Sequence, residues 1–173
     1  NSEKSSQIKK LNNKDLEKKF LQAKSMERAG LYEEAQLLFI EINQQYPGQV
    51  KYFVPLKNYL KQKEEWEDLL LYAQLFRDAR NNDFQSKLEY IDIYIWMENK
   101  LMWQEICKEL IDEPTTDSNK IINLIQRLVN NSKIDYSREL LQEYRKKSNR
   151  EDFFSLKMGS ILSTRMAYHS AID

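Results

Sequence analysis

Residues that end or reverse a helix are scarce in this sequence, because its 173 residues include only 3 glycines and 3 prolines. A sheet with many tight turns needs more of both, so the sequence favours an all-α fold with short connections. A run of 18 apolar residues is also missing. The sequence therefore predicts no helix that spans a membrane.

Cysteine and histidine occur once each, as Cys107 and His169. A single cysteine excludes an internal disulfide framework and a cysteine-based zinc site. A single histidine leaves a histidine-dependent triad or a multi-histidine metal site without its second member, and 3 glycines cannot build a phosphate-binding loop. We therefore predict that the protein is not an enzyme and that it holds no metal and no cofactor.

An excess of charge of either sign is absent too, because 27 Lys and Arg residues balance 27 Asp and Glu residues. A neutral chain creates no overall field that would attract nucleic acid or an anionic membrane. Arginines interleaved with aromatic residues, which are typical of nucleic-acid grooves, are missing as well. The sequence predicts no nucleic-acid partner.

What the sequence does contain is apolar residues at helical spacing along most of its length. Leu16 and Phe20 share one helical face, and Ala35 and Phe39 share another. Between them, the stretch "ERAGLYEEA" carries Gly30, which can adopt the positive φ of a tight helix-to-helix turn. The stretch "QQYPG" cannot continue the second helix. Together these features predict a helical hairpin.

This hairpin repeats along the chain. We take as the anchor of each repeat the large residue expected to open its second helix, namely Tyr32, Trp66, Trp103, Ile134 and Tyr168. The anchors are separated by 34, 37, 31 and 34 residues, a mean step of 34. The third repeat is therefore expected to be displaced by about one turn and the fourth to restore the phase.

The repeat resembles the tetratricopeptide repeat, a 34-residue helix–turn–helix unit. Ala35, Phe39 and Pro47 match the family pattern Ala-x3-Phe followed by a proline. The later repeats match in period and hydrophobic pattern, as degenerate repeats of the bacterial type. The resemblance implies a right-handed superhelical solenoid of about four and a half repeats.

The resemblance also implies how the chain is divided. We expect residues 1–14 to be a poorly ordered leader or the start of the first helix, and residues 15–173 to be one repeat domain. The final stretch "AYHSAID" matches the first two turns of a second helix, because Tyr168 and Ala171 stand where Tyr32 and Ala35 stand in the first repeat. A solenoid normally ends on a helix with a polar outer face, so a stop within the fifth repeat predicts further repeats or another domain of a longer chain.

In the family, the first helices line the concave side of the superhelix, which usually binds an extended peptide or a partner's helix. Residues at the matching positions here, together with the off-phase Trp96, define the predicted partner-binding groove: Phe20, Lys24, Val54, Asn58, Ile91, Ile95, Trp96, Ile122 and Gln126. Family members that grip a C-terminal carboxylate place a Lys and an Asn on this surface, and the apolar residues here depart from that pattern. We therefore expect a helix or strand with hydrophobic anchors rather than a free carboxylate.

Three functions remain open. The first is a protein–protein interaction scaffold in bacterial envelope assembly, since "YEEAQLLFIEINQQYPG" is similar to repeats of envelope proteins. The second is a regulatory or sensor region of a larger enzyme or regulator, and the third is an RNA-binding helical-repeat protein, which the neutral charge disfavours. The chain begins at Asn1 rather than Met, which fits a removed signal peptide and a periplasmic or secreted location, or a trimmed cytoplasmic protein.

Overall fold

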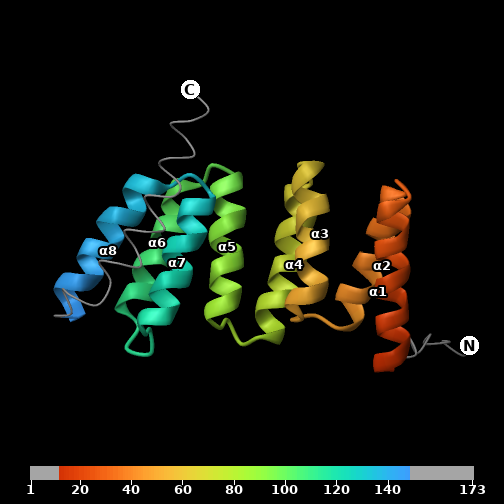
Figure 1. The fold of residues 1–173 in the computed structure, drawn as a ribbon, viewed down its shortest axis with the longest axis horizontal. Helices are drawn as coiled ribbons and strands as arrows, with labels where there is room; N and C mark the ends of the chain where they lie inside the picture. Colours follow the sequence, from red (N-terminus) through yellow and green to blue (C-terminus); the bar gives the residue numbers. More distant parts are fainter. Residues whose placement is uncertain (1–11, 149–173) are drawn as a thin grey trace, which may run out of the picture. The chain divides into compact units, whose positions relative to one another are not determined.

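The computed structural model describes residues 12–148, and within that range the chain forms eight α-helices and no strand (Figure 1). The helices are α1 (Asn13–Arg28), α2 (Tyr32–Gln45), α3 (Val50–Gln62), α4 (Trp66–Ala79), α5 (Phe84–Trp96), α6 (Lys100–Asp112), α7 (Ser118–Asn130) and α8 (Ile134–Ser148). The all-α prediction is confirmed for this part of the chain. None of these helices is long and apolar enough to cross a membrane.

The helices recur with a constant period. The second helix of each hairpin begins at residue 32, 66, 100 or 134, and the first helices α3, α5 and α7 begin at residues 50, 84 and 118, so every step is 34 residues. The displacement predicted for the third repeat is therefore wrong. Trp103 lies one turn inside α6, at the position that Ala35 occupies in α2. A large indole at an interior position of the helix was mistaken for the residue that opens it.

Each hairpin turns through the same backbone hydrogen bond. The N–H groups of Leu31, Glu65, Asn99 and Lys133 donate to the carbonyls of Met26, Leu60, Tyr94 and Leu128, with N···O distances of 2.9, 2.9, 2.8 and 2.8 Å. The residue before each donor has a positive φ, which is 79° at Gly30, 56° at Glu64, 58° at Glu98 and 60° at Ser132. This is the Schellman ending of a helix, and three of its four left-handed positions are occupied by residues with a Cβ atom.

The core follows the 34-residue period. The positions three and seven residues into the second helices are all buried: Ala35, Leu69, Trp103 and Ser137, then Phe39, Ala73, Cys107 and Leu141. The first helices contribute the fully buried Phe53, Leu56 and Leu60 from α3. Phe53 stacks on Phe76 with ring centroids 4.4 Å apart. Burial of each such aromatic ring stabilises the fold by a few kcal/mol, at about 25 cal/mol per Å² of apolar surface.

The connections between hairpins are held by polar contacts. Gly48, at φ 90°, presents its carbonyl to Arg80 Nη1 at 2.9 Å. Asp83 and Asp117 cap α5 and α7, because their carboxylates accept the backbone N–H of Ser86 and Lys120 at 3.0 and 2.9 Å. The two caps help to fix where α5 and α7 begin.

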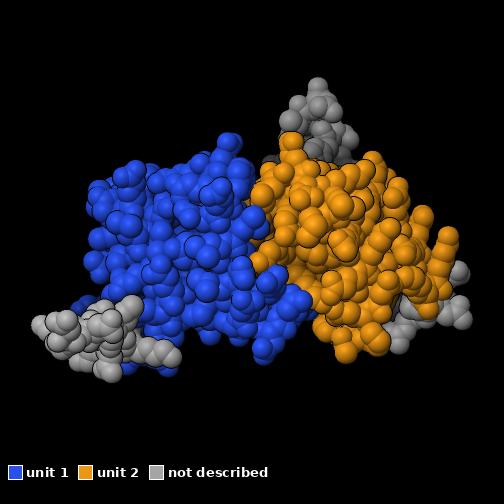
Figure 2. All heavy atoms as spheres, turned by 180° about the vertical axis from the view of Figure 1, so that it is seen from behind, with its two compact units in different colours: residues 1–86 blue, residues 87–173 orange. Residues whose placement is uncertain are grey.

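The chain falls into two compact units, which are coloured separately in Figure 2. Residues 1–86 include α1 to α4, and residues 87–173 include most of α5 with α6 to α8. In the first unit α1 packs on α2, α2 on α3 and α4, and α3 on α4; in the second unit α6 and α7 both pack on α8. Helix α1 begins at Asn13, within the range expected to be a leader or the start of the first helix. The predicted fifth repeat, with Tyr168 and Ala171, lies outside the described residues.

Candidate partner-binding surfaces

The predicted groove residues of the first unit differ in exposure. Lys24 and Val54 are half-buried, and Asn58 is exposed. Phe20 is half-buried because its ring packs edge-on against Phe39 and Tyr52, with centroids 6.0 and 5.1 Å away. Phe20 is therefore mainly a packing residue, and the other three offer surface to a ligand.

Ile91 of the second unit has no exposed surface, so it cannot line a groove as predicted. The reason is the register: with α6 beginning at Lys100, Ile91 stands nine residues before the second helix, as the buried Ala23 and Ile125 do in their repeats. The position that matches Lys24 and Asn58 is taken by Asp92. The other four predicted residues are half-buried, namely Ile95, Trp96, Ile122 and Gln126.

The first-unit groove is an open cavity of about 250 Å³ between α1, the start of α2, and α3. Its lining brings together three of the predicted residues with five others: Lys24, Glu27, Tyr32, Val54, Pro55, Asn58, Tyr59 and Gln62. Lys24 and Asn58 come from successive first helices and are one period apart. A cavity of this size takes one or two side chains of a partner rather than a large cofactor.

The groove is electrically neutral. Lys24 and Glu27 are its only charged lining residues, and they form an ion pair along α1. Their side chains are 35% and 31% exposed, so the pair is partly shielded from water. A ligand that enters the groove therefore meets a cation that is already neutralised.

Polar groups without partners also line this groove. Asn58 and Gln62 are exposed amides that make no hydrogen bond within residues 12–148. The hydroxyl of Tyr59 is buried and lacks a hydrogen-bond partner in the same part of the chain. Burial raises the pKa of Tyr59 to about 12, and the nearby Glu27 carboxylate adds to this shift. The Tyr59 hydroxyl thus remains a neutral donor across the physiological pH range.

In the second unit, Trp96 is held in place by a buried polar network. Its indole Nε1 donates to Asn131 Oδ1 at 3.0 Å, and Asn131 Nδ2 donates to Asp92 Oδ1 at 2.7 Å. Arg127 pairs with Asp92 and with Glu89. These contacts link α5 to the C-terminal end of α7 beside Trp96.

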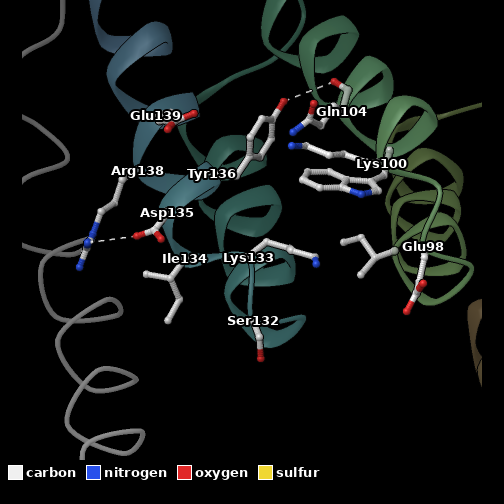
Figure 3. Close-up of a pocket in the computed structure, with 12 residues that line it drawn as sticks. Glu98, Lys100, Gln104, Ser132, Lys133, Ile134, Asp135, Tyr136, Arg138 and Glu139 are labelled. Carbon is white, nitrogen blue, oxygen red and sulfur yellow. Dashed lines mark hydrogen bonds and ion pairs between the residues drawn. The ribbon is translucent and has the colours of Figure 1, made fainter.

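The second-unit cavity is larger, about 810 Å³, and lies where α6 and α8 begin (Figure 3). Trp103 meets Tyr136 edge-on at 4.7 Å between ring centroids, and Lys133 Nζ lies 5.9 Å from the indole centroid. Figure 3 shows the Tyr136 hydroxyl directed at the Gln104 carbonyl, to which it donates at 3.4 Å. Three cationic and three anionic side chains line this cavity: Lys100, Lys133, Arg138, Glu98, Asp135 and Glu139.

Among the residues that line the second-unit cavity, Ile95 is the only one that the sequence analysis predicted. The missed residues lie at helix starts, which the displaced register had put in the wrong place. A signal was available in the spacing, because Glu98 and Ser132 are one period apart, as are Lys100 and Ile134.

The described residues contain no group of three His, Cys, Asp or Glu side chains that could hold a metal ion. Cys107 is fully buried, and burial raises the pKa of its thiol to about 12, which opposes formation of the nucleophilic thiolate. His169 lies outside the described range. This part of the chain presents several open cavities with mixed polar and apolar walls, among them the two described above.

Comparison with models of protein families, with curated proteins and with solved structures found no significant match. The resemblance to tetratricopeptide repeats therefore depends on the matching residues of the first repeat and on the period.

Proposed function

We propose that this protein is a non-catalytic protein–protein interaction scaffold of the tetratricopeptide type. In this proposal the repeats stack into a right-handed solenoid, and the first helices bind a partner protein or peptide. Envelope assembly in a bacterium is the specific setting that we favour, on the similarity of the first repeat.

One observation carries the proposal. Lys24 and Asn58, which occupy the same position in successive first helices, line one open groove with Val54 between them in the sequence. An extended partner can contact such a surface once per repeat, so affinity can accumulate along the chain. The neutral, amide-bearing character of this groove supports a protein partner better than a nucleic acid.

Position-specific photo-cross-linking tests the proposal. A benzophenone amino acid is placed at Asn58 or Gln62 in the groove, and at Gln74, an exposed residue of α4, as the matched control. We expect a discrete cross-linked protein from cells of the source organism at the two groove positions and none at Gln74. Reconstitution with the purified partner should then show weaker binding by an Asn58→Ala variant of unchanged helicity.

Two outcomes would refute the scaffold proposal. One is the same set of cross-links at groove and control positions, and the other is full affinity of the Asn58→Ala variant for the purified partner. Either result would mean that the groove does not bind the captured protein.

A further inference from the structure

We infer that the first-unit groove binds the main chain of an uncharged, extended, internal peptide segment, and that Glu27 is the residue that makes it reject carboxylates. This inference rests on the proposed function, because it names the ligand class of the same groove. It assigns a specificity role to an acidic residue outside the predicted groove set.

The role of Glu27 follows from its contact with Lys24. Lys24 is the only cation that lines the groove, and its ammonium is bound to the Glu27 carboxylate one turn along α1. A ligand carboxylate that approached Lys24 would have to displace Glu27 or lie beside it, where like charges repel. A neutral ligand leaves this ion pair intact. The groove therefore discriminates against acidic side chains and free C-termini.

The unpartnered polar groups fit a peptide backbone. Asn58 and Gln62 are four residues apart on α3, which places them about 6 Å apart along the helix. Every second residue of an extended chain repeats at about 6.5 Å. Each amide can both donate to a carbonyl and accept from an N–H, so the two amides can pair with successive outward-facing peptide groups. A ligand carboxylate can only accept from these amides, so it would leave their acceptor oxygens unused.

One further feature adds donor capacity to the groove. The buried Tyr59 hydroxyl lines it and makes no hydrogen bond of ordinary geometry among the described residues, although the Glu27 carboxylate lies near it. A buried polar group without a partner is costly, and a ligand peptide group that reaches it would remove that cost.

The apolar walls select the side chain of the segment. Val54 and Pro55 form one wall, and Tyr32, which is 55% exposed, forms another beside Tyr59, with ring centroids 6.3 Å apart. The volume of about 250 Å³ suits one aliphatic side chain with its flanking peptide groups. The ligand class is therefore an extended segment with an aliphatic residue and no nearby charge.

A matched pair of small probes tests the inference. N-acetyl-leucine N-methylamide carries two peptide groups and an aliphatic side chain, and N-acetyl-leucine differs by ending in a carboxylate. The side-chain amide signals of Asn58 and Gln62 are followed by NMR while each probe is titrated into the 173-residue chain. We expect the neutral probe to shift both signals and to bind about tenfold more tightly than the acid.

A Glu27→Gln variant makes the test specific. The substitution frees Lys24, so the affinity for N-acetyl-leucine should rise by about tenfold while that for the neutral probe changes by less than about twofold. Glu34→Gln is the control, because Glu34 is an exposed glutamate of α2 that does not line the groove. It should leave both affinities unchanged.

The inference is overturned if the wild-type chain prefers the carboxylate probe, if neither probe shifts the Asn58 and Gln62 signals, or if Glu27→Gln and Glu34→Gln behave alike. These results are separable from failure of the proposed function. A partner that cross-links at Asn58 through an acidic segment or its C-terminus would preserve the scaffold proposal and refute this one.

Discussion

At the scale of single residues, Arg127 connects two helices of the second unit through charge. Its guanidinium pairs with Asp92 and Glu89, whose side chains are only 5% and 1% exposed. Burial acts to lower the pKa of Arg127, but the two carboxylates outweigh it and raise that pKa. Removal of this cation would leave both carboxylates buried without the counter-charge that Arg127 supplies, which costs more than an intact buried pair contributes.

An Arg127→Met variant should therefore be destabilised by about 3–5 kcal/mol, measured as the free energy of unfolding in urea at pH 7. Arg28→Met is the control, because Arg28 is exposed in the last turn of α1, and it should change stability by less than about 1 kcal/mol. Similar values for the two variants would show that the network contributes no more than a surface charge.

Residue identity alone did not reveal this network. Asp92, Arg127 and Asn131 read as surface residues in a charged sequence, and they acquire their partners only because α5 and α7 lie within hydrogen-bonding distance of each other. The role proposed for Glu27 is also not visible in the sequence. Only the structure shows that Glu27 and its ion-pair partner Lys24 line the same groove.

At the scale of elements, the turn inside each hairpin is the most regular feature of the chain. The left-handed residue recurs every 34 positions, yet only the first repeat places a glycine there. A residue with a Cβ atom is strained at positive φ, so Glu64, Glu98 and Ser132 each lower the stability of their turns.

Glycine at these positions should stabilise the protein. We expect Glu98→Gly and Ser132→Gly to raise the free energy of unfolding by about 0.5–1 kcal/mol each, since relief of strain exceeds the added entropy of the unfolded chain. Gly30→Ala should lower it by about 1 kcal/mol, because an added Cβ meets nothing within 4 Å and only backbone strain remains. Urea titration checks all three variants. If both glycine variants are less stable than the wild type, the strain argument is wrong.

At the scale of the whole molecule, the free energy of unfolding should be nearly constant at intermediate pH and should fall at both acidic and alkaline pH. Burial acts to raise the pKa of Asp83, but hydrogen bonds from Arg80 and Ser86 outweigh it and keep that pKa below its ordinary value of 3.8. Its contribution is therefore present above pH 3.8 and is lost as the pH falls through the lower folded pKa. Tyr59 acts in the opposite sense, because its raised pKa of about 12 makes its contribution present below pH 10 and lost as the pH rises towards 12.

A Tyr59→Phe variant should therefore lose less stability than the wild type between pH 10 and 12, because it has no phenol to ionise. At pH 7 its stability should be unchanged or raised by about 1 kcal/mol, since the lost hydroxyl had no partner in the described residues. Urea midpoints across this pH range provide the measurement. If the two proteins lose the same stability between pH 10 and 12, the ionisation of Tyr59 does not cause that loss.

The helices and their period were predictable, because apolar spacing, Gly30 and Pro47 act within a few residues of themselves. The prediction went wrong at one large aromatic residue: Trp103 was taken as the residue that opens a helix, although α6 begins at Lys100. That single shift placed Ile91 in the groove in place of Leu88, and Ile95 in place of Asp92. Both alignments kept the mean step of 34, and only the requirement of an exact 34-residue step at every repeat would have separated them.

By itself, therefore, the sequence determined an all-helical chain of repeated hairpins and the approximate faces of its first helices. The tertiary structure decided the register of the third repeat, the buried partners of Asp92 and Arg127, and which side chains share a cavity. The physical reason is range: helix formation depends on neighbours three and four residues away, whereas a groove exists only where side chains of different helices leave space between them.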